Sequence, residues 1–172
     1  MNSSSARPAA EPPGAGAVAR AVLAQVWPLL ALAGLLYGAA LAWQVRSGDP
    51  VPAAMAWTLL AKPAVLGLVT PFVLHECAHV LVLRCIPTVT GITVERTAWR
   101  TSVLPEGTTT RRQTAAVAVA GPAACAAVGA LLWLSGLDRP LSWWYLAHLL
   151  FLLPCFGDGR ALWGNVRERA RS

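Results

Sequence analysis

The stretch that decides the fold runs from Ala64 to Leu83 and reads AVLGLVTPFVLHECAHVLVL. Nearly all of it is apolar, yet His75, Glu76 and His79 lie close together near its end. Ionisable groups are costly within a membrane span, so their presence there indicates a function. Residues i and i+4 lie on one face of a helix, where two imidazoles can bind the same metal ion. The stretch therefore predicts a transmembrane helix that carries a metal site.

The composition is that of a membrane protein. Of the 172 residues, 56% are hydrophobic and only 13% are charged, which favours a membrane class over a soluble domain. The net charge is +6, but the arginines lie between the apolar runs and form no patch interleaved with aromatic residues. We therefore expect the lipid bilayer as a partner and no nucleic acid. The cysteines show no disulfide-framework spacing, so we expect them to be reduced.

The sequence divides into three regions. Residues 1–19 are rich in Ser, Ala, Pro and Gly, which predicts a disordered tail. Residues 20–166 are expected to form a single membrane-embedded domain, and residues 167–172 a basic tail. The expected fold class is an all-α polytopic membrane protein with about four transmembrane helices and a small cytoplasmic β-hairpin.

Four apolar segments are the predicted spans: Ala21 to Trp43, Pro63 to about Cys85, Gln113 to about Leu134, and Leu141 to Pro154 with a break that extends to Gly159. Lys62-Pro63 is expected to divide the second apolar region, because proline interrupts a helix. Residues 53–61 would then form a short interfacial helix or a kinked extension. The third span is rich in Ala and Gly, which lets neighbouring backbones come close.

A polar region, Arg84 to Arg112, separates the second span from the third. Within it, Thr88–Val94 and Ala98–Val103 are rich in β-branched residues and partly alternate, as is typical of two strands of a hairpin. Pro105 to Gly107 is expected to be a loop.

The distribution of arginines predicts the orientation in a cell membrane. With four spans and an inner N-terminus, the inner segments hold Arg7, Arg20, Arg84, Arg96, Arg100, Arg111, Arg112, Arg160, Arg167, Arg169 and Arg171. The outer segments hold only Arg46 and Arg139, with Lys62 at a boundary. Positive residues favour the cytoplasmic side. We therefore expect both termini, the hairpin and the site to face the cytoplasm.

Two histidines are not enough for a catalytic zinc, which usually has three protein ligands and one open position. At about 1.5 Å per residue, the histidine pair lies roughly 18–24 Å from the outer end of its helix, Asp158 roughly 26 Å and His148 about 10 Å. Asp158 matches the depth better and lies in a Gly-flanked break, which is tolerated where the backbone lines a site. His148 is interpreted as a packing residue or a partner of a ligand. Gly121 falls level with the pair and would leave room beside the metal.

Three motifs occur in an order that resembles the site-2 protease family of intramembrane zinc metalloproteases. The motifs are H-E-x-x-H at His75–His79, Ala-Gly-Pro at Ala120–Pro122, and Leu-Leu-Pro at Leu152–Pro154 followed by Asp158-Gly159. The resemblance covers roughly residues 63–163. Cys125 and Phe151 stand where the family usually has Asn.

The resemblance implies a site-2-protease-like core and a Zn²⁺ ion held by His75, His79 and Asp158. Glu76 would be the catalytic residue that takes the proton of a water molecule and passes it to the leaving amine. The substrate would be a membrane-spanning or membrane-associated protein or peptide. The substrate would unwind locally, and its unwound segment would pair with the hairpin as an added strand.

Two other hypotheses stay open. One is a catalytically inactive metal-binding relative that acts as a membrane interaction protein, which the Cys125 and Phe151 differences favour. The other is a haem protein with two axial histidines, His148 with His75 or His79. The haem hypothesis gives Glu76 no role.

Overall fold

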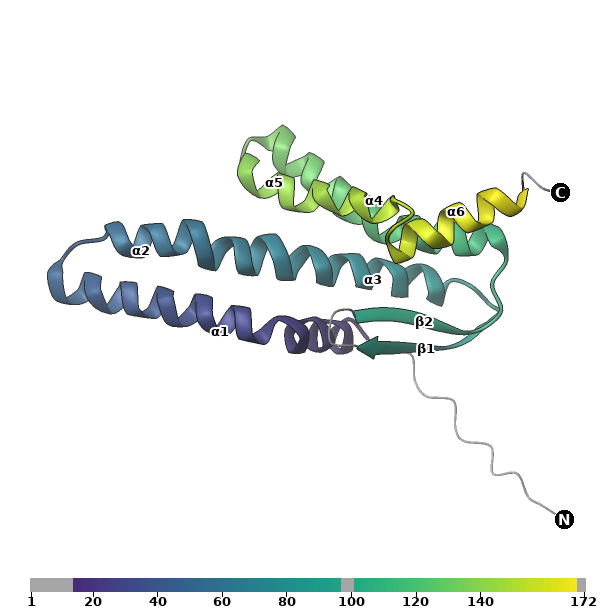
Figure 1. Ribbon diagram of the computed structural model, residues 1–172, viewed down its shortest axis with the longest axis horizontal. Helices are drawn as coiled ribbons and strands as arrows, with labels where there is room; N and C mark the ends of the chain where they lie inside the picture. The colour runs from purple at the N-terminus through teal and green to yellow at the C-terminus, as the bar shows by residue number, and fades with distance from the viewer. Residues whose placement is uncertain (1–13, 97–100, 170–172) are drawn as a thin grey trace, which may run out of the picture.

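The computed structural model describes residues 14–96 and 101–169, which form a bundle of helices with a two-stranded hairpin at one end (Figure 1). The elements in chain order are α1 (Ala15–Ser47), α2 (Val51–Ala56), η1 (Trp57–Ala61), η2 (Pro63–Val69), α3 (Thr70–Arg84), β1 (Val89–Arg96), β2 (Thr101–Gly107), α4 (Arg111–Ser135), α5 (Arg139–Leu146), η3 (Ala147–Leu152) and α6 (Gly157–Arg169). The start of α1, the hairpin and α6 lie at the same end of the bundle (Figure 1).

Helix α1 begins earlier than predicted. Residues 15–19 were expected to belong to a disordered tail, but they are helical. The reason is that Val18 is fully buried in a small core with Val80 and Leu83 of α3 and Ile92 of β1. That burial favours a helical start over a solvated tail. The rest of the predicted tail lies outside the described residues.

The second apolar region is one continuous helix from Val51 to Arg84, so the predicted division at Lys62-Pro63 is wrong. Of the two forms expected for residues 53–61, the extension is the one found. Much of the backbone from Trp57 to Val69 is π-helical. These wider turns carry the chain through Pro63, whose missing N–H would interrupt a regular α-helix.

The hairpin has the predicted topology but a longer second strand. Strands β1 and β2 pair antiparallel, with Val94 opposite Val103 and an irregularity after Val89. Residues 105–107, predicted to be a loop, belong to β2, and Pro105 lies opposite Ile92. A proline is tolerated there because each strand of a two-stranded sheet has an unpaired edge. The predicted start of this strand, Ala98, lies outside the described residues.

Within residues 14–96 and 101–169, three helices are long and apolar enough to cross a membrane: α1, the helix Val51–Arg84, and α4. The last apolar segment is broken as predicted, with residues 139–152 and 157–164 bent by 41°. It makes a fourth span if the bent pair is counted as one. Helix α6 continues to Arg169, so the start of the predicted basic tail is helical. Residues 170–172 lie outside the described part of the chain.

Small residues bring α4 and its neighbours close together, as predicted for the third span. A Cβ atom added at Gly129 of α4 would lie 2.9 Å from Leu146 Cγ of α5. Lys62 forms an ion pair with Asp138, which also accepts a hydrogen bond from the backbone N–H of Leu141 at 3.0 Å. The hydrogen bond from Lys62 lowers the pKa of Asp138. The pair connects the long second helix to the start of α5.

The contact at Gly129 generates a stability prediction. Gly129→Ala would force a methyl group into Leu146, and overpacking of this kind typically costs about 1–3 kcal/mol. The matched control is Gly38→Ala on the exposed face of α1, where an added Cβ meets nothing within 4 Å. Both changes gain the same helix propensity, about 1 kcal/mol. We expect thermal unfolding in detergent to show a lower midpoint for Gly129→Ala than for Gly38→Ala. Equal midpoints would contradict the packing.

Candidate metal centre

The structure brings the three predicted metal ligands together. His75 and His79 lie one turn apart on α3, both buried, with their ring centroids 4.7 Å apart and their planes at 84°. Asp158 lies in the first turn of α6 and faces both rings. Its Oδ2 is 2.9 Å from Nε2 of His75, and its Oδ1 is 3.5 Å from Nε2 of His79. One carboxylate therefore spans both imidazoles.

A tight break in the chain places Asp158. Between η3 and α6 the backbone turns so closely that a Cβ at Gly159 would collide with the carbonyl group of Leu153. Only glycine fits this approach. Two side chains close the turn: Trp163 Nε1 donates to the Leu152 carbonyl at 3.0 Å, and Arg160 donates to the Cys155 carbonyl at 2.9 Å. The local backbone geometry therefore requires glycine at position 159, directly after Asp158.

Helix α4 forms the wall behind the histidines. The Nδ1 of His79 lies 2.7 Å from the Val117 carbonyl oxygen, which can only accept, so this nitrogen carries the proton and donates. The Nε2 atom is then left to face Asp158. One turn further along α4, a Cβ at Gly121 would lie 2.7 Å from Nε2 of His79 and 2.8 Å from Nε2 of His75. The prediction that Gly121 leaves room at this level is confirmed.

These residues can hold a metal ion. The ligand atoms of His75, His79 and Asp158 all lie within 4.8 Å of one another. Two imidazole nitrogens and a carboxylate oxygen are a donor set used by catalytic zinc, which takes three protein ligands and keeps one position open. Gly121 adds to the fit, because its missing side chain leaves space against both Nε2 atoms. Other divalent transition metals accept the same donors, so the geometry does not by itself select zinc.

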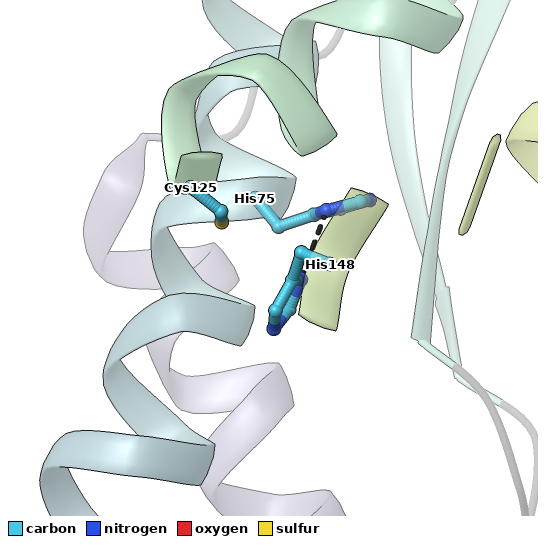
Figure 2. Close-up of side chains that lie close together, drawn as sticks. All are labelled: His75, Cys125 and His148. Carbon is cyan, nitrogen blue, oxygen red and sulfur yellow. Dashed lines mark hydrogen bonds between the residues drawn. The ribbon is translucent and has the colours of Figure 1, made fainter. Parts of the chain in front are cut away.

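A second buried group adjoins the first and shares His75 (Figure 2). The Nδ1 of His148, from η3, lies 3.2 Å from the Nδ1 of His75, and Cys125 of α4 completes a group that could also hold a metal ion. All three side chains are buried. The sequence predicts that His148 lies nearer the outer end of its helix than the histidine pair does. This prediction is wrong, because His148 contacts His75.

The error has an identifiable source. The depth of His148 was counted from Leu141, whereas the ion pair with Lys62 sets Asp138 as the level of reference. Counting from Asp138 adds three residues, about 4.5 Å at 1.5 Å per residue, to the depth of His148. A signal for Cys125 was present in the sequence, because it follows Gly121 by one helical turn and so shares its face.

A cavity of about 740 Å³ contains the first group. Glu76, which is buried, lines it together with His75, His79 and Asp158. The rest of the wall is largely apolar and includes residues of α1, η2, β2 and α4: Val22, Val26, Leu68, Val103, Leu104, Val117 and Ala118. The carboxylate of Glu76 and the candidate metal ligands therefore face one apolar chamber closed on one side by the hairpin.

Comparisons of this chain with protein-family models, curated proteins and solved structures found no match. The resemblance to site-2 proteases therefore stays a prediction from short motifs. The two positions that depart from those motifs lie beside the centre. The Phe151 ring is 5.2 Å from that of His75, and the Cys125 thiol donates to the Pro71 carbonyl at 3.2 Å.

The close approach of α4 predicts the effect of a single methyl group. Gly121→Ala would push against the Nε2 atoms of His75 and His79, and we expect the displaced imidazoles to bind an added divalent metal ion, Zn²⁺ as the probe, about tenfold or more weakly. The measurement is a chelator competition on the detergent-purified protein. Gly34→Ala, where an added Cβ meets nothing within 4 Å, is the control. Equal affinities of Gly121→Ala and Gly34→Ala would mean that a bound ion does not lie against α4.

Proposed function

We propose that the protein is an intramembrane zinc metalloprotease of the site-2 type, which hydrolyses peptide bonds of membrane-spanning or membrane-associated substrates. One observation carries the proposal. The candidate metal group His75, His79 and Asp158 and the carboxylate of Glu76 line the same largely apolar cavity. Ionisable side chains are costly in free energy among apolar helices, so a cluster of them there indicates a function.

The roles follow from position. His75, His79 and Asp158 would hold the ion, and Glu76 is the general base. When bound, zinc supplies Lewis acidity and makes a water molecule acidic enough to react near neutral pH. Glu76 would accept a proton from the attacking water molecule as the water oxygen bonds to the peptide carbonyl carbon. The same carboxyl group then delivers the proton to the amide nitrogen as the C–N bond breaks.

The cavity wall supports an apolar peptide as substrate. Leu104 and Pro105 of β2 line it, so an unwound segment in the cavity would lie beside this strand. A transmembrane helix hides its own peptide bonds in backbone hydrogen bonds, so local unwinding is needed before cleavage. Pairing with a strand edge would satisfy the freed backbone groups.

The proposed location is a cell membrane, with both termini and the site toward the cytoplasm. The uneven distribution of arginines supports this orientation. The placement of the start of α1, the hairpin and α6 at one end of the bundle agrees with it (Figure 1).

A non-catalytic metal-binding protein is the second candidate function. The observation that favours it is Phe151, an apolar ring against His75 at a position where the site-2 motif has a hydrogen-bonding Asn. The haem hypothesis has less support. A haem iron between His75 and His148 would have to separate two nitrogen atoms that lie 3.2 Å apart and hydrogen-bond directly. Both nitrogens of His79 already face Val117 and Asp158.

The catalytic role predicts a separation of metal binding from hydrolysis. Glu76→Gln should retain stoichiometric zinc but reduce cleavage by about 10²–10⁴-fold, because the amide takes no proton. His79→Ala should lose both. The measurement combines metal analysis with mass spectrometry of new termini in single-span membrane proteins co-expressed with each variant.

The alternatives separate cleanly in the same experiment. If wild type and Glu76→Gln bind zinc equally and produce the same fragments, the protein is a metal-binding protein without protease activity. If the wild type binds no metal, both functions are excluded.

A further inference from the structure

We propose that His148 is a positioning residue for the metal centre: it accepts a hydrogen bond from Nδ1–H of His75 and so keeps the Nε2 of His75 available to the metal. The two rings meet at their Nδ1 atoms, 3.2 Å apart (Figure 2). The inference rests on the proposed metal centre and deepens it, because neither the motif nor the ligand set gives His148 a role.

The two ring nitrogens of His75 have different partners, and this difference fixes where the ring proton lies when a metal is bound. Its Nε2 is 2.9 Å from Asp158 and is the nitrogen that faces the candidate metal position. A neutral imidazole has one N–H and one lone pair, and a metal takes the lone pair. The proton of a metal-bound His75 must therefore be on Nδ1, where it points at His148. The Nδ1 of His148 is then the acceptor, and its own proton is on Nε2.

The two ligand histidines differ in what fixes their protons. At His79 the partner is the Val117 carbonyl, 2.7 Å away, which can only accept. At His75, within the described part of the chain, the only hydrogen-bond partner of Nδ1 is the His148 side chain. An imidazole can donate or accept, so whether Nδ1 of a metal-bound His75 finds an acceptor depends, among the described residues, on His148 alone. Such partners orient ligands and raise metal affinity.

Packing holds the His148 ring in place. It is 4% exposed, and its edge meets the ring of Phe72 with centroids 4.9 Å apart and planes at 70°. Phe151 lies on another side at 5.2 Å. Neither aromatic ring can compete for the proton of His75. The cage therefore fixes the direction of the acceptor.

The contacts of Cys125 favour a hydrogen bond between His75 and His148 over a second metal ion bound by His75, Cys125 and His148. The thiol of Cys125 already donates to the Pro71 carbonyl at 3.2 Å, so it has a partner without a metal. A His75 that bound one ion through each nitrogen would lose its ring proton and bring two cations together in an apolar setting, which is costly. The hydrogen bond needs neither.

Two substitutions test the acceptor. His148→Phe keeps an aromatic ring in the cage formed by Phe72 and Phe151 but removes the acceptor, and we expect zinc affinity to fall by about 10–100-fold. His148→Asn places an amide oxygen where the Nδ1 accepted, and we expect it to restore most of that loss. Affinity is measured by chelator competition on the full-length protein in detergent. Unchanged affinity in His148→Phe would overturn the proposal.

Cys125→Ser is the control for a second ion. Its hydroxyl can still donate to Pro71, so zinc affinity and a stoichiometry of one should not change. A wild-type stoichiometry of two that falls to one in both Cys125→Ser and His148→Phe would replace the proposal with a second metal site. If the wild type binds no zinc, the metal centre itself is refuted, which is a different result from a His148 variant that binds normally.

NMR of the wild-type protein tests the proposal without any substitution. In zinc-loaded protein with ¹⁵N-labelled histidine, NMR should show a proton on Nδ1 of His75 that exchanges slowly with water, because it is buried and bonded to His148. A metal-bound Nδ1 on His75, or a freely exchanging proton there, would contradict the assignment.

Discussion

The carboxylate of Asp158 facing both His75 and His79 is the interaction on which this structure depends. Imidazole side chains buried among apolar helices, such as those of His75 and His79, need a polar partner. Asp158 supplies that partner to both imidazoles at once, at 2.9 Å and 3.5 Å. To reach them, the last apolar segment must break, turn and restart as α6. The 41° bend and the close backbone approach at Gly159 are therefore consequences of the site.

The same constraint explains why α4 carries glycines. The histidines occupy the space between α3 and α4, so a side chain at Gly121 has no room. Gly129 allows the equivalent approach of α5 further along the helix. Glycine lowers helix propensity by roughly 1 kcal/mol relative to alanine. Close helix packing around a buried polar centre offsets that cost, and it also holds the ligands at fixed distances.

Local spacing predicted most of the site, and contacts between distant segments were harder to predict. The pair His75 and His79 followed from helical periodicity, and Asp158 followed from its Gly-flanked break. His148 was misplaced, because its depth depends on the Lys62–Asp138 ion pair, which leaves no pattern in the sequence. The predicted division at Pro63 was wrong for a related reason. Proline usually interrupts a helix, but the π-helical turns around Pro63 let the helix continue.

The two departures from the site-2 motifs both contact the surroundings of His148. Phe151 packs against His148 and His75 with centroid distances of 5.2 Å in each case, and Cys125 belongs to the same buried group. These two positions therefore both adjoin the buried group of His75 and His148. An Asn at Phe151 would introduce donors and acceptors beside Nδ1 of His75 and compete with His148 for its proton. The apolar ring of Phe151 does not compete in this way, so the imidazole of His148 remains the acceptor.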